Sequence, residues 1–108
     1  MLKPGDVVIV DFPGATTTKR RPSLVVSTEL YHKERIDVVL AVLTTNISLA
    51  TCSTDYILQD WNKAGLHSPT AFKPYLSTFL NSKTTLIGRL SDKDWQQIQL
   101  KLKLAIAF

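Results

Sequence analysis

The chain has 108 residues, enough for one domain and too few for two, so we expect a single domain over residues 1–108. Hydrophobic residues make up 44% of the sequence, which supports a packed core and argues against a disordered chain. Thirteen Lys and Arg stand against nine Asp and Glu, and this net charge of +4 favours a polyanionic partner.

The counts of cysteine and histidine limit the disulfides and metal sites that the chain can form. The single cysteine, Cys52, excludes an internal disulfide and leaves no second thiol to share a metal. Two histidines, His32 and His67, are too few for an ordinary zinc site, so we expect no metal and no cofactor. No apolar run reaches the ~18–20 residues of a membrane helix, and the first residues lack the apolar region of a signal peptide. We therefore expect a cytoplasmic protein with no membrane partner.

The N-terminal half predicts β-strands. Three runs rich in β-branched residues cover residues 7–12, 23–27 and 36–45, and they are so continuously apolar that we expect parts to be buried on both faces. Their connections are too short for a helix of ten residues, which favours an antiparallel meander. Residues 13–21, with a Pro-Gly turn, three threonines and three cations, predict a mobile surface loop.

The second half mixes short elements. Residues 54–58 predict a short strand, and residues 60–64 a short helix stopped by Gly65. Two more strands are predicted at residues 70–78 and 84–90, and Pro74 places the first of them at a sheet edge or a bulge.

The clearest helix follows Ser91, which begins a sequence typical of a capping box with Asp94 in the third helical position. Asp92 and Asp94 both favour the positive end of the helix dipole. An apolar stripe at spacings of three and four docks the helix on the barrel or on a partner subunit; it consists of Trp95, Ile98, Leu102 and Ala105. Together the elements predict a small antiparallel barrel with a C-terminal helix.

Two clusters are candidates for binding phosphate. Lys19, Arg20 and Arg21 offer cations beside a strand, although charge alone favours a solvated loop. Thr44, Thr45 and Asn46 offer hydroxyls and an amide at a strand end, although these residue types are also ordinary in turns.

The other potentially reactive side chains are better explained by ordinary surface or core positions than by catalysis. We expect His32 and His67 to be exposed loop histidines and Cys52 to be a half-buried thiol. Trp95 belongs to the core, whereas Trp61 is compatible with either the core or base stacking. The carboxylates do not cluster: Asp6 and Asp11 face opposite sides of one strand, and no acid lies between Trp61 and Ser91. This argues against a two-metal nuclease.

The ordered motifs resemble those of the MazF/PemK family of toxin endoribonucleases. GDVVIVDF at residues 5–12 is similar to the family's first strand, and RPSLVVS at residues 21–27 is similar to its R-P-x-L-V signature. AVLT at residues 41–44 is similar to the family's strand ending in threonine. WNKAGL at residues 61–66, SPT at residues 68–70 and IGRLSD at residues 87–92 complete the set. The matches span nearly the whole chain in order.

The resemblance implies a mainly β (α+β) fold, a small SH3-like antiparallel barrel of the PemK/CcdB type with a C-terminal α-helix, usually as a homodimer. It implies the toxin of a type II toxin–antitoxin system, a metal-independent and sequence-specific endoribonuclease (mRNA interferase) acting on single-stranded RNA. The 2′-OH attacks the neighbouring phosphate and leaves 2′,3′-cyclic phosphate and 5′-OH ends. The implied partner, besides RNA, is an antitoxin with an acidic, partly disordered segment.

The resemblance also assigns roles to residues. Arg21 takes the position of the family's catalytic arginine and stabilises charge on the phosphoryl oxygens, and Thr44 takes that of the catalytic threonine and holds a non-bridging oxygen. The residues implied to bind RNA are Phe12, Thr18, Lys19, Arg20, Thr45, Asn46, Lys73 and Tyr75.

The sequence departs from the family at two places. The loop after the first strand reads ATTTK at residues 15–19 without the family's acid, and FKPY at residues 72–75 lacks a carboxylate that some members place there to act as a base. Two alternatives therefore stay open: a non-enzymatic, CcdB-like toxin that poisons gyrase, and a catalytically decayed member that still binds nucleic acid.

Overall fold

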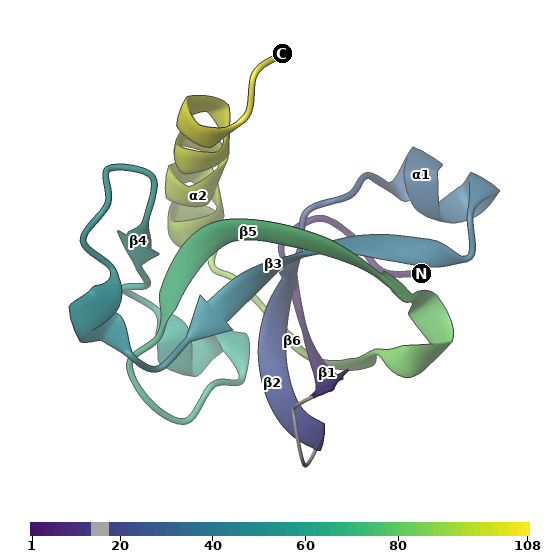
Figure 1. The fold of residues 1–108 in the computed structure, drawn as a ribbon, viewed down its shortest axis with the longest axis horizontal. Helices are drawn as coiled ribbons and strands as arrows, with labels where there is room; N and C mark the ends of the chain where they lie inside the picture. The colour runs from purple at the N-terminus through teal and green to yellow at the C-terminus, as the bar shows by residue number, and fades with distance from the viewer. Residues whose placement is uncertain (14–17) are drawn as a thin grey trace.

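Six antiparallel strands form a strongly curved sheet in the computed structural model, which describes residues 1–13 and 18–108 (Figure 1). The strand order is β4-β5-β3-β2-β1-β6, so the first three strands are consecutive neighbours, as predicted. The strands are β1 (Asp6–Pro13), β2 (Thr18–Val25), β3 (Asp37–Thr44), β4 (Tyr56–Ile57), β5 (Ala71–Leu80) and β6 (Thr85–Arg89). The predicted small antiparallel barrel with a C-terminal helix is confirmed, in the form of a six-stranded half-barrel.

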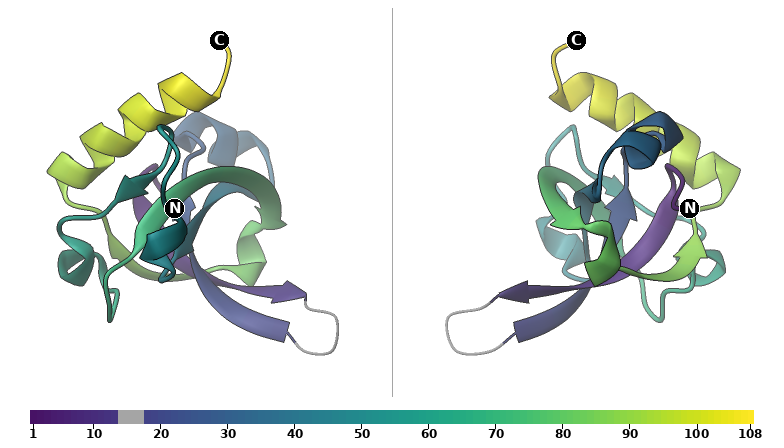
Figure 2. Two further views of the ribbon diagram at one scale, coloured as in Figure 1. Left: turned by 60° about the vertical axis from the view of Figure 1, so that its left-hand side comes forward. Right: turned by 90° about the vertical axis from the view of Figure 1, so that its right-hand side faces the viewer.

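Two α-helices and three single turns of 3₁₀-helix complete the described fold. They are α1 (Glu29–Glu34), α2 (Asp92–Ala105), η1 (Ile47–Leu49), η2 (Trp61–Ala64) and η3 (Asn81–Lys83). Helix α2 lies across one side of the curved sheet (Figure 2). None of the described helices has the length and apolar character needed to cross a bilayer.

Alternate residues of the central strands face two separate cores, which confirms the prediction of burial on both faces. Val7 of β1 and Leu24 of β2 pack in one cluster with Phe72, beneath α2. Val8 and Val10 of β1 pack in the other cluster, which continues through Val25, Val38 and Leu40. The period-two alternation of a strand produces this division.

Strand β2 begins earlier than the sequence predicted. Residues 18–21 were expected in a loop, but they pair with β1, with Asp11 opposite Arg20 and Val10 opposite Arg21. The pairing with β1 satisfies the hydrogen-bonding groups of the backbone. The side chains are polar because this part of the hairpin projects beyond the other strands (Figure 2). Residues 14–17 of the predicted loop lie outside the described residues.

The predicted irregularity at Pro74 is confirmed. Ala41 of β3 pairs with Leu76 of β5, whereas Val42 pairs with Lys73, so Pro74 and Tyr75 form a bulge. Proline has no N–H to donate to a ladder, and a bulge removes the need for one. The bulge turns the following part of β5 away from the first core.

The capping of α2 is confirmed for Ser91 but wrong for Asp94. The Ser91 hydroxyl accepts a hydrogen bond from the Asp94 N–H at 3.2 Å. The Asp94 carboxylate is fully buried and accepts bonds from the Tyr56 hydroxyl at 2.6 Å and from the N–H groups of Gln59 and Asp60 at 3.1 and 2.8 Å. Asp94 therefore anchors the chain near β4 to α2, because a buried carboxylate requires several donors.

The apolar stripe of α2 is confirmed for three of its four residues. Ile98 is fully buried, and Trp95 and Leu102 pack against the first core, whereas Ala105 is exposed. The short helix α1 was not predicted. It begins at Thr28, whose hydroxyl accepts a bond from the Tyr31 N–H at 3.2 Å, and six residues are too few to show a helical period.

Candidate functional site

Strands β2 and β3 diverge beyond their short paired segment (Figure 1). A basic groove opens between the diverging ends. The two strands pair only through Ser23, Leu24 and Val25, so the residues before Ser23 and those after Val42 separate. The space between them is about 400 Å³ and is lined by Lys19, Arg20, Arg21, Pro22, Leu43, Thr44 and Thr45. The structure thus brings Arg21 and Thr44 together, with two more cations beside them.

The side chains of this groove suit an anionic oxygen. Arg21 is exposed and offers guanidinium donors, and no carboxylate stands among the described residues that line the groove. The Thr44 hydroxyl accepts a hydrogen bond from the Asn46 N–H at 3.1 Å. No described residue accepts a bond from that hydroxyl, so its proton is available to a ligand.

The remaining residues implied to bind RNA have different surroundings. Asn46 is exposed beside the groove and accepts a bond from the Ser48 hydroxyl at 3.0 Å. Lys73 donates to the Leu49 carbonyl at 2.9 Å and lies 3.8 Å from an Asp55 carboxylate oxygen, with only 15% of its side chain exposed. Tyr75, beneath the Lys73 ammonium group, is 63% exposed. The Lys73 charge is thus already engaged within the protein.

Two further residues of that set are described only in their backbone. Phe12 pairs with Lys19, and Thr18 pairs with Pro13, at the far end of the hairpin. Their side chains lie outside the described residues.

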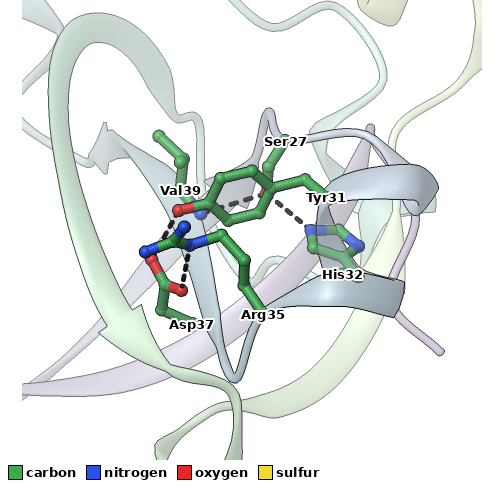
Figure 3. A network of polar contacts seen from close by, with 6 residues as sticks. All are labelled: Ser27, Tyr31, His32, Arg35, Asp37 and Val39. Carbon is green, nitrogen blue, oxygen red and sulfur yellow. Dashed lines mark hydrogen bonds and ion pairs between the residues drawn. The ribbon is translucent and has the colours of Figure 1, made fainter.

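The interpretation of His32 as an exposed loop residue is wrong. His32 belongs to α1, where its Nδ1 lies 2.7 Å from the Leu2 carbonyl and its Nε2 lies 2.5 Å from the Ser27 hydroxyl (Figure 3). A carbonyl only accepts, so Nδ1 donates to Leu2, while Nε2 is hydrogen-bonded to the Ser27 hydroxyl. Ser27 in turn accepts from the Val39 N–H at 3.0 Å. His32 is a structural link between the N-terminus, β2 and β3.

Helix α1 is tied to β3 by a second contact (Figure 3). The Tyr31 hydroxyl donates to Asp37 at 2.6 Å, and the Arg35 guanidinium donates to the same carboxylate at 3.2 Å. The hydrogen bond from Tyr31 lowers the pKa of Asp37, and the same bond raises the pKa of Tyr31. These groups stabilise a turn far from the basic groove.

The second histidine, the cysteine and the two tryptophans lie either at the surface or against the first core. His67 is exposed, as predicted, whereas Cys52 is exposed rather than half-buried, because it lies in a surface turn. Trp61 and Trp95 both pack against the first core, which settles the open interpretation of Trp61. Among residues 1–13 and 18–108, no three His, Cys, Asp or Glu side chains gather as a metal site would require.

A match to a protein-family model shows which family this chain belongs to. A family model described as PemK-like, MazF-like toxin of type II toxin–antitoxin system matches residues 3–106. The chain belongs to this family. No curated protein matches this MazF-like chain in a sequence comparison.

Solved structures share the MazF-like fold at low sequence identity. An endoribonuclease in complex with its cognate antitoxin from a mycobacterial species has a TM-score of 0.79 at 19% identity, covering 100% of this chain and 99% of that chain. A MazE–MazF complex from Deinococcus radiodurans has a TM-score of 0.75 at 15% identity, covering 98% of each chain. The Mycobacterium tuberculosis toxin MazF-mt6 has a TM-score of 0.74 at 18% identity, covering 93% of this chain and 94% of that chain.

Proposed function

We propose that this MazF-like chain is a toxin that cleaves single-stranded RNA at specific sequences in the basic groove, without a metal ion. The observation that supports it most is the meeting of Arg21 and Thr44, from separate strands, in one groove with Lys19 and Arg20. Cations attract the RNA backbone, and a groove without carboxylates among its described lining residues has no ligands for Mg²⁺.

The proposed reaction uses a nucleophile that the RNA carries. The ribose 2′-oxygen forms a bond to the adjacent phosphorus, the bond from phosphorus to the 5′-oxygen breaks, and the products are a 2′,3′-cyclic phosphate and a 5′-OH. Arg21 stays protonated, so its donors stabilise the charge on the phosphoryl oxygens. The Thr44 hydroxyl, oriented by the Asn46 N–H, donates to a non-bridging oxygen.

The residues that line the basic groove also limit which groups can move protons in the proposed reaction. The described lining residues include no carboxylate to take the 2′-OH proton, and guanidinium groups do not lose theirs near neutral pH. We therefore assign removal of the 2′-OH proton to hydroxide from the solvent, and protonation of the leaving 5′-oxygen to water, which regenerates the hydroxide.

The proposed protein partner is an antitoxin. Two of the similar structures are complexes with an antitoxin. An acidic, partly disordered segment complements the cations of the basic groove and folds on binding. We also propose a homodimer, because an apolar concavity of about 360 Å³ lies beside α2 and its lining includes the exposed apolar residues Leu76 and Phe108.

The test is incubation of the purified protein with long single-stranded RNAs in EDTA, beside an Arg21→Ala variant. We expect discrete cuts with 2′,3′-cyclic phosphate and 5′-OH ends from the wild type and none from the variant. Single-stranded DNA of the same sequence is the control, since it lacks the 2′-OH. RNA that stays intact over several sequences would instead favour a gyrase-poisoning toxin or a decayed nucleic-acid-binding protein.

A further inference from the structure

A second concavity, the apolar pocket, adjoins the basic groove. It has a volume of about 370 Å³, within the ~300–1,000 Å³ typical of sites for small organic groups. Its walls come from β1, β2, β6 and the segment that follows η2, and the apolar side chains among them are Ile9, Pro22, Leu66 and Ile87. His67, Ser68 and Thr45 add polar atoms at its edge.

The pocket and the groove are neighbours that share two lining residues. Pro22 and Thr45 line both of them, so a ligand held by Arg21 and Thr44 lies next to the pocket. In a single-stranded RNA, the group attached one sugar away from a phosphate is a nucleobase. We propose that the apolar pocket binds one unstacked nucleobase next to the scissile phosphate and so contributes to sequence selection. This inference rests on the proposed function.

The chemistry of the pocket fits a base better than a sugar or a second phosphate. Ile9, Leu66 and Ile87 present hydrocarbon surface to the flat faces of a base, and no cation is among the described residues that line the pocket. The exposed imidazole of His67 is placed to stack or to hydrogen-bond, and Ser68 offers a hydroxyl to a base edge. Proteins recognise single-stranded RNA through such stacking and edge contacts.

The wall that carries His67 is held in place before any ligand arrives. Gly65 has φ +82°, and a Cβ built there lies 2.4 Å from the Ile87 carbonyl oxygen, so its backbone packs directly on β6. Beyond it, the Thr70 hydroxyl donates to the Ser68 carbonyl at 2.9 Å, and the Leu58 N–H donates to the Thr70 carbonyl at 3.0 Å. A preformed wall lowers the entropy lost on binding.

The test measures binding rather than cleavage. The probe is a 2′-O-methyl oligonucleotide, which cannot be cut, carrying the cleavage sequence mapped for the wild type, or a random sequence if nothing is cut. Each position is made abasic in turn. For the wild type we expect one position beside the scissile phosphate where loss of the base weakens binding about tenfold.

Three variants test whether the base at that position occupies the apolar pocket. Ser68→Phe fills the pocket, so the same abasic change should then weaken binding by less than about twofold. His67→Ala removes one contact and should reduce the effect to about threefold. Asn62→Ala, an exposed polar residue of η2 outside the pocket, is the matched control and should behave as the wild type. Thermal melting establishes that each variant is folded.

The outcomes separate this inference from the proposed function. Cleavage by the wild type, with a base dependence that both pocket variants leave unchanged, overturns the pocket and leaves the ribonuclease standing. Base-dependent binding that Ser68→Phe abolishes, without cleavage of any RNA, supports the pocket and contradicts the ribonuclease. 2′-O-methyl oligonucleotides that do not bind at all contradict the pocket, and RNA that also stays intact contradicts the ribonuclease.

Discussion

Arg21 and Thr44 line the same groove, yet each is held by a different neighbouring strand. Arg21 pairs with Val10 on β1, and Thr44 pairs with Ala71 on β5. The separation of β2 from β3 therefore creates the groove, while the outer pairings keep both residues on rigid strands. Catalysis by positioned donors depends on such rigidity.

Arg21 and Thr44 should each be needed for cleavage but not for folding. Removing one preorganised donor commonly lowers kcat by about 10²–10³-fold, so we expect losses of this order for Arg21→Ala and Thr44→Val. Single-turnover cleavage of the mapped RNA measures them. Lys83→Ala and Thr78→Val, exposed and outside the groove, are the matched controls and should keep wild-type rates. Equal losses in the controls would contradict these roles.

The rate of cleavage should rise with pH. If hydroxide from the solvent takes the 2′-OH proton, the rate increases about tenfold per pH unit between about pH 6 and pH 9, with no plateau. A guanidinium group keeps its charge throughout this range. The pH dependence of single-turnover cleavage checks this slope. A plateau near neutral pH that His67→Ala removes would identify the imidazole in the adjoining apolar pocket as the base instead.

Asp94 should contribute strongly to stability. Asp94→Ala leaves three donors without their acceptor, namely the Tyr56 hydroxyl and the N–H groups of Gln59 and Asp60. Because each buried unsatisfied group costs about 1–3 kcal/mol, we expect a loss of about 3 kcal/mol in the free energy of unfolding, measured in urea. Asp92→Ala, exposed in the same helical turn, should cost about 0.5 kcal/mol. Equal losses would show that Asp94 acts only at the helix terminus.

Tyr56 should make stability fall in alkali. Burial, followed by the hydrogen bond to Asp94, raises the pKa of Tyr56 above its ordinary value. The unfolded chain loses this proton first as the pH rises, so the contribution is complete below about pH 10 and is lost above it. Free energies of unfolding between about pH 8 and 11 should decline less in Tyr56→Phe. Tyr75→Phe, exposed, should decline as the wild type does.

Gly88 should not tolerate a side chain. A Cβ at this position lies 2.1 Å from the Ala64 carbonyl oxygen, which is backbone and has little freedom to move. We expect Gly88→Ala to destabilise the protein by about 2–3 kcal/mol, seen as a lower Tm. Ser82→Ala, in the exposed turn before β6, should leave Tm nearly unchanged. An unchanged Tm in Gly88→Ala would mean that η2 moves away from β6 at little cost.

Structural features that depend on residues close together in the chain were predictable from the sequence. The β-branched runs, the Ser91 cap and the Gly65 stop each depend on residues that are near one another in sequence. Helix α1 and the early start of β2 were not, because a six-residue helix shows no period and residues 18–21 form a strand only by pairing with β1. The roles of His32 and Asp94 depend on partners distant in sequence, such as Leu2 and Tyr56.

The sequence by itself determined the family, the strand pattern, and Arg21 and Thr44 as the candidate catalytic pair, because motif order and side-chain type are local properties. Only the tertiary structure decided that these two residues share a groove, that Lys73 is engaged by Leu49 and Asp55, and that an apolar pocket opens next to Thr45. A concavity depends on where strands stop pairing and how strongly the sheet curves. Both follow from register between segments far apart in the chain, which no local pattern encodes.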